Sequence, residues 1–134
     1  MGDLILLLKS IHTFDRERAA SQIGDYLRGS RIPAQPFQQV VSALTETLSK
    51  ERIDSVKECI LFALNDAADQ PNWKLCDMEP VAGLLESASE AATPYLLEIL
   101  GASRDVRFRQ LIARYLNSPN PDIKRAASDA LRWL

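Results

Sequence analysis

The sequence predicts an all-α fold, and three features of the chain support this class. Apolar residues recur at the three- and four-residue spacing of one helical face through most of the chain. No stretch shows the apolar–polar alternation that half-buried strands require. Alanine and aliphatic side chains dominate the 46% of hydrophobic residues, whereas aromatic residues make up 7%. This balance favours helices over a β-sandwich.

Four helices are expected in the first half of the chain. Asp15 is the predicted N-cap of the second helix, and Gly29 is expected to end it. Two prolines within 31–36 separate the second helix from the third. The fourth helix starts at Asp54 or Ser55 and is apolar nearly all round, which is typical of a central helix. The apolar spacing places these helices over residues 4–11, 15–29, 37–48 and 54–67.

Four more helices are expected in the second half, after the longest irregular stretch, 69–77. Thr93 is the predicted cap of the sixth helix, and Gly101 is expected to close it. Asn120 is the predicted N-cap of the last helix, with Pro121 at its first position. The apolar spacing places these helices over residues 81–88, 94–101, 108–115 and 121–134.

The last helix carries small residues on its apolar face, so another helix can approach it closely, and stacking helices usually come in repeats. Superposing 56–64 on 123–131 supports repetition, although alanine-rich amphipathic helices resemble one another in any case. The superposition gives identical residues at Lys57/Lys124, Ala63/Ala130 and Leu64/Leu131. The segment Asp105-Val106-Arg107 similarly resembles Asp122-Ile123-Lys124.

In these segments the chain resembles short, alanine-rich HEAT-type helical repeats. The likeness is best over 91–134, where 94–100 looks like a first helix; in the first half only 54–64 matches. Lys124 stands where that family usually has arginine. The resemblance implies a small right-handed α-α superhelix of about eight short antiparallel helices, irregular in its N-terminal half. A length of 134 residues fits one such domain, 1–134.

Charge and cysteine content restrict the compartment and the partners. Residues 68–103 hold one basic and six acidic side chains, whereas 104–134 hold seven basic and three acidic ones. Cys59 and Cys76 show no metal-like spacing, which favours a reducing compartment. No apolar run approaches the ~18 residues of a membrane span, and the N-terminus does not read as a signal peptide. We therefore expect a cytoplasmic protein that does not bind membranes.

No pattern in the sequence indicates catalysis, a cofactor or a metal. His12 is the only histidine, and no carboxylate or cysteine stands at ligand or triad spacing from it. No glycine-rich phosphate loop is present. Among the thiols, Cys76 in its expected loop is the more reactive candidate. Paired acidic residues are expected to form a solvated face, so we expect a protein that is not an enzyme.

The expected binding surface is the acidic segment around Trp73. A tryptophan in a loop is a frequent interface anchor, and acidic neighbours attract a basic partner. The alternative is that Trp73 folds back and seals the core. The predicted partner-binding residues are Asp66, Asp69, Asn72, Trp73, Asp77, Glu79 and Glu86.

Small, mildly acidic HEAT-like proteins of this kind resemble bacterial immunity proteins of contact-dependent inhibition systems. This resemblance implies a protein partner, a cognate basic toxin domain such as a nuclease, covered by 66–98. Two alternatives stay open: a HEAT-repeat accessory protein of the chromophore-lyase type, and nucleic-acid binding through the basic C-terminal helices. Nucleic acid is the less favoured partner, because the basic residues spread over more than one helical face.

Overall fold

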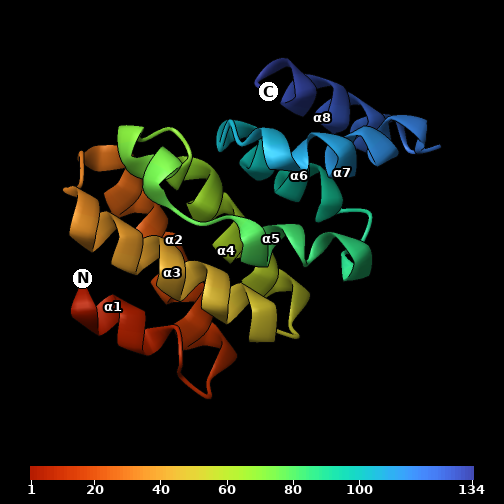
Figure 1. Ribbon diagram of the computed structural model, residues 1–134. Helices are drawn as coiled ribbons and strands as arrows, with labels where there is room; N and C mark the ends of the chain where they lie inside the picture. Colours follow the sequence, from red (N-terminus) through yellow and green to blue (C-terminus); the bar gives the residue numbers. More distant parts are fainter. The chain divides into compact units, whose positions relative to one another are not determined.

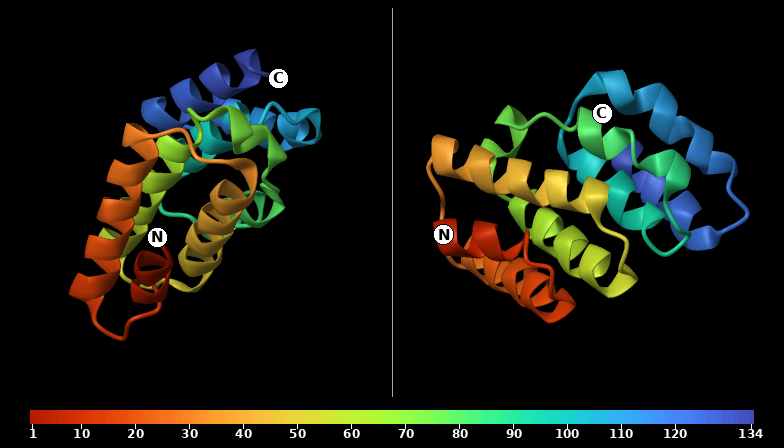
Figure 2. Two further views of the ribbon diagram at one scale, coloured as in Figure 1. Left: turned by 90° about the vertical axis from the view of Figure 1, so that its left-hand side faces the viewer. Right: turned by 90° about the horizontal axis from the view of Figure 1, so that it is seen from below.

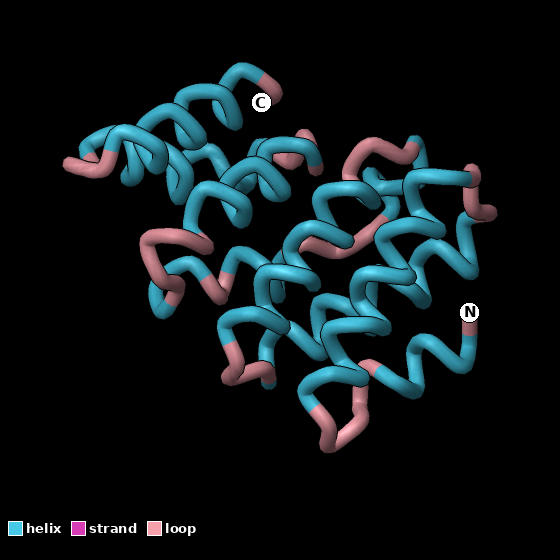
Figure 3. Tube along the Cα trace, turned by 180° about the vertical axis from the view of Figure 1, so that it is seen from behind, coloured by secondary structure: helices cyan, strands magenta, loops and turns pink.

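The computed structural model describes all 134 residues, and every regular element is helical (Figures 1 and 3). It contains eight α-helices, as predicted, with short 3₁₀ segments and no strand. None of the helices is both long and apolar enough to cross a bilayer. The chain divides by its internal contacts into two compact units, Met1–Cys76 and Asp77–Leu134, which are described in turn.

In the first unit, α2 and α4 form the most extensive helix contact, and they lie side by side in both views of Figure 2. A Cβ added at Gly24 of α2 would lie 3.6 Å from the Cα of Ala63 on α4, so the two backbones approach closely. The core between them includes Ile23 and Ile60, both 0% exposed. The helices of this unit are α1 (Gly2–Leu7), α2 (Thr13–Gly29), α3 (Ala34–Lys50), α4 (Asp54–Ala67) and the 3₁₀ segment η1 (Pro71–Leu75).

In the second unit, the corresponding contact joins α6 and α8. The predicted small-residue face of α8 is confirmed: Ala126, Ala127 and Ala130 are all buried. The predicted cap is confirmed too, since the Asn120 side chain accepts hydrogen bonds from the first turn of α8. The helices of this unit are α5 (Glu79–Ala82), η2 (Leu85–Ser87), α6 (Thr93–Ala102), η3 (Val106–Phe108), α7 (Arg109–Ala113), η4 (Arg114–Asn117) and α8 (Pro121–Arg132).

The two principal helix pairs use the same packing device. Gly101 of α6 faces Ala130 of α8 as Gly24 of α2 faces Ala63 of α4, and a Cβ added at Gly101 would lie 2.7 Å from both the Cα and the Cβ of Ala130. Ala63 and Ala130 are the residues that the sequence superposition pairs. In both units, the helix that carries the alanine packs on the second helix before it.

Several predicted helix ends differ from those of the structure. Helix α1 stops at Leu7, which leaves Ile11 outside the helix and 89% exposed. Asp15 is not a cap, because α2 begins at Thr13 and the Asp15 carboxylate accepts a hydrogen bond from Ser10. Helix α6 ends at Ala102, one residue after Gly101, and the close approach of α8 requires a residue without a side chain at Gly101.

The sixth helix also begins differently, because Thr93 is its first residue and not its cap. The Thr93 hydroxyl instead donates to the backbone oxygen of Ser89, at 2.8 Å. At the other end, Arg104 follows the helix with φ at 57°, the only residue of the chain with positive φ. This left-handed position after a helix is usually taken by glycine or asparagine.

Candidate functional site

The loop around Trp73, which the sequence predicts as a binding surface, packs into the first unit and is held there by internal hydrogen bonds. Trp73 is 2% exposed, so its side chain folds back into the core, as the alternative interpretation expects. The buried indole cannot contact a partner directly. The physical reason is that η1 packs against α3, which removes the large apolar ring from water. The prediction of an exposed tryptophan anchor is therefore wrong.

Two amide side chains near Trp73, those of Gln70 and Asn72, hold this loop in place. The Gln70 Nε2 donates to the backbone oxygens of Leu27 and Ser30, each at 2.7 Å, and its Oε1 accepts from the N–H of Ile32. The Asn72 side chain donates to the Ile32 oxygen at 2.9 Å. These bonds satisfy backbone groups that the proline-containing break leaves without helical partners. Asn72, one of the predicted partner-binding residues, therefore makes a hydrogen bond within the first unit.

The predicted acidic residues are distributed over both units. In the first, Asp66 pairs with Arg28 at 2.6 Å and its side chain is only 18% exposed, whereas Asp69 is exposed. In the second, Asp77 accepts a hydrogen bond from the backbone of Glu79, and Glu79 lies 3.6 Å from Arg107. The last of the set, Glu86, is exposed. Several of these carboxylates are thus engaged within their own unit.

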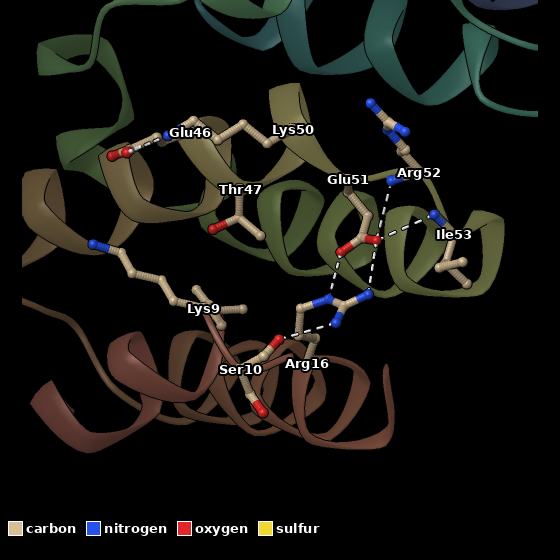
Figure 4. Close-up of a pocket in the computed structure, with 10 residues that line it drawn as sticks. Lys9, Ser10, Arg16, Glu46, Thr47, Lys50, Glu51, Arg52 and Ile53 are labelled. Carbon is tan, nitrogen blue, oxygen red and sulfur yellow. Dashed lines mark hydrogen bonds and ion pairs between the residues drawn. The ribbon is translucent and has the colours of Figure 1, made fainter. Parts of the chain in front are cut away.

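A pocket of about 550 Å³ in the first unit is lined by four basic and two acidic side chains (Figure 4). The guanidinium of Arg16 donates to both carboxylate oxygens of Glu51, at 2.8 and 3.1 Å. Lys50 pairs with Glu46 at 3.2 Å. The guanidinium of Arg52 points away from Glu51, as Figure 4 shows. Two ion pairs are thus internal to this pocket, and Lys9 and Arg52 leave it with an excess of two positive charges.

A second pocket, of about 560 Å³, lies between α6 and α8 in the second unit, and its charge excess is negative. Four carboxylates and one guanidinium line it, an excess of three negative charges. We call this site the acidic groove. Its polar lining residues are Glu90, Tyr95, Glu98, Asn120, Asp122, Arg125 and Asp129.

Two carboxylates on opposite walls of the acidic groove repel each other. The pKa of Glu98 on α6 is raised, first because burial disfavours its charged form and second because of the carboxylate of Asp129 on α8. The only ion pair of Asp129 is with Arg132, at a loose 3.5 Å. A bound cation would therefore reduce an existing repulsion, which makes the groove suited to a lysine or arginine side chain.

Glu98→Gln should slightly stabilise the protein at neutral pH, by less than about 1 kcal/mol, because the Glu98 side chain is only partly withdrawn from water. The raised pKa means that the folded state binds the proton more readily than the unfolded state. The stability that the protonated Glu98 contributes is therefore lost as pH rises from the ordinary pKa of 4.5 through the higher pKa of the folded state. In thermal unfolding, the advantage of the variant over the unchanged chain should therefore grow as pH rises from about 4 to about 7. A destabilised variant at neutral pH would contradict this account.

The sequence analysis counted Glu90 and Glu98 in the acidic segment but missed the other wall of the groove. Asp122 and Asp129 belong to the segment treated as the basic end of the chain. A usable signal was present, because residues seven apart lie on one face of a helix. What the sequence could not supply was the packing of α8 on α6, which brings these two residues opposite Glu98.

Neither the thiols nor any acidic cluster offers an evident reactive centre. Burial raises the pKa of Cys76 to about 11, which disfavours the thiolate and makes this thiol a poor nucleophile. Cys76, the thiol that the sequence favours as the more reactive, is therefore not activated in this structure. No group of three or more His, Cys, Asp or Glu residues is arranged to hold a metal ion.

Comparison with known proteins supports the fold class and gives no information on function. No family model matches the chain, and no curated protein matches it. Among solved structures, the crystal structure of an engineered protein is similar, with a TM-score of 0.70 and 21% sequence identity. The match covers 98% of this chain and 60% of that protein, so the chain spans well under two thirds of its length. The likeness supports an all-helical fold alone.

Proposed function

We propose that this chain is a non-enzymatic, protein-binding helical scaffold, and that its acidic groove receives a basic segment of a protein partner. The observation that carries the proposal is the repulsion between Glu98 and Asp129 across the groove, which no cation of the chain fully neutralises. A basic side chain placed between them would gain Coulomb energy from both carboxylates. Such a charged recess also accelerates the approach of a basic partner.

We further propose a HEAT-like superhelical arrangement and the role of a bacterial immunity protein that neutralises a basic toxin domain, such as a nuclease. The repeated glycine–alanine contacts, Gly24 with Ala63 and Gly101 with Ala130, support the repeat arrangement. The excess of acidic side chains over 68–103 supports a basic partner. The resemblance to immunity proteins of contact-dependent inhibition systems supplies the biological class.

The groove is tested by titrating the chain with nona-arginine at low salt and following heat release. Changing both Glu98→Gln and Asp129→Asn should weaken binding by about tenfold, since each wall loses its charge. The matched control changes Asp3→Asn and Glu58→Gln, two exposed acidic residues of the first unit, and should alter the affinity by less than about twofold. Equal losses in both double variants would show a net-charge effect and reject the groove as the site.

The immunity role has its own test, namely protection of growing cells. Co-expression with a toxin encoded beside this chain should restore growth and yield a salt-sensitive 1:1 complex. The Glu98→Gln, Asp129→Asn variant should lose protection while remaining folded. Full protection by that variant would separate the immunity role from the groove.

A further inference from the structure

Three segments of the second unit meet at an exposed arginine–tryptophan stack. The guanidinium of Arg104, in the loop after α6, lies over the ring of Trp133 at 5.1 Å from its centroid. The first residue of α7, Arg109, donates a hydrogen bond to the backbone oxygen of Leu134, which holds α7 beside the end of α8. Trp133 remains 57% exposed. A large aromatic side chain is thus fixed in place and left open to solvent.

The backbone at Arg104 is unfavourable for its side chain. Its φ of 57° is left-handed, a conformation in which glycine is free of strain and arginine is not. Arg104 makes no ion pair within the chain, unlike Arg107, which pairs with Asp105 at 2.7 Å. Local conformation therefore does not account for an arginine here, and the interaction that its side chain makes within the chain is the stack on Trp133. Strained residues of this kind cluster at binding and catalytic sites.

The charge of the whole unit selects the class of partner. Residues 77–134 contain seven basic and eight acidic side chains, so the unit has no net positive charge. Binding to nucleic acid relies on a continuous basic track along the phosphates. Beside Arg104, that track is interrupted by Asp105. A protein surface is favoured instead, because tryptophan and arginine are the residues most enriched among interface hot spots.

We propose that Arg104 and Trp133 form a second docking site, which binds a partner protein through a carboxylate side chain flanked by apolar residues. The carboxylate bonds to the guanidinium, whose stacked position keeps its N–H edge available. The apolar neighbours of that carboxylate cover the exposed indole of Trp133. This site has the opposite charge preference to the acidic groove and does not depend on it.

The test pans a phage-displayed library of random dodecapeptides on the full chain and measures the affinity of the selected peptides. We expect enrichment of peptides in which Asp or Glu adjoins an apolar residue, and an affinity loss of about tenfold or more in Arg104→Gly and in Trp133→Ala. Arg114→Ala, which removes another exposed arginine of this unit, is the matched control and should stay within about twofold. Arg104→Gly keeps the fold, because glycine suits a left-handed position.

The remaining outcomes are decisive as well. The proposal would be overturned if the selected acidic peptides bound the Arg104→Gly variant as tightly as the unchanged chain. It would also be overturned if the selected peptides were not enriched in Asp or Glu. Binding of a thymidine oligonucleotide that Arg104→Gly abolishes, without acidic-peptide binding, would assign the surface to nucleic acid. The Glu98→Gln, Asp129→Asn variant should retain acidic peptides, so the acidic groove and this site succeed or fail separately.

Discussion

Gly101→Ala is expected to destabilise the second unit by about 2 kcal/mol and to lower its unfolding midpoint by roughly 8 °C. The added methyl group would lie 2.7 Å from the Cα and Cβ of Ala130, well inside van der Waals contact. The nearest atoms include backbone, so no flexible side chain can rotate away. Helices α6 and α8 must separate to accept the methyl group, which loosens the principal contact of the unit.

Gly29→Ala is the matched control for this prediction. No atom lies within 4 Å of a Cβ added at Gly29, and this glycine has no positive φ. Alanine there should be neutral or stabilising by up to about 1 kcal/mol, because it restricts the unfolded chain. Thermal unfolding of both variants compares the close approach with the general effect of replacing a glycine. Equal stability of the two would show that α6 and α8 do not pack as closely as described.

Glu51→Ala is expected to reduce the free energy of unfolding by about 3 kcal/mol, because it leaves Arg16 without its anion. The side chains of Arg16 and Glu51 are 16% and 4% exposed. Glu51 also accepts hydrogen bonds from the N–H groups of Arg52 and Ile53, so its removal leaves backbone donors unsatisfied. Urea unfolding measures the loss. Lys50→Ala breaks an exposed pair in the same pocket and should cost less than about 0.5 kcal/mol.

The same pair predicts sensitivity to acid. Burial works to raise the pKa of Glu51, but hydrogen bonds from Arg16 and from the backbone outweigh it and lower the pKa. The stabilisation is therefore complete above the ordinary value of 4.5 and is lost as pH falls through the folded value. Replacing both Arg16 and Glu51 with methionine should recover much of the stability and flatten this acid limb. A double variant as unstable as Glu51→Ala would show that the pairing is not the cause.

The acidic groove shows how far a sequence argument reaches into a site. Counting charges along the sequence predicts a basic partner for the acidic segment 68–103. Two residues of that segment, Glu90 and Glu98, line the acidic groove. It also singled out Trp73, which η1 buries against α3. An isolated tryptophan in a polar loop gives no signal of its direction, because burial depends on residues that approach from elsewhere in the chain. The Arg104–Trp133 stack joins residues 29 positions apart and was invisible for the same reason.

The sequence by itself determined the helical class, the eight helices, the Asn120 cap and the alanine face of α8, because apolar period and capping are local properties. Tertiary structure decided which surfaces remain open. Gly101 illustrates the division, since its sequence context predicts a helix end, which α6 reaches one residue later, whereas only the structure shows that Ala130 leaves no room there for a side chain. The α6–α8 contact that requires Gly101 also sets Asp129 opposite Glu98 and so creates the acidic groove.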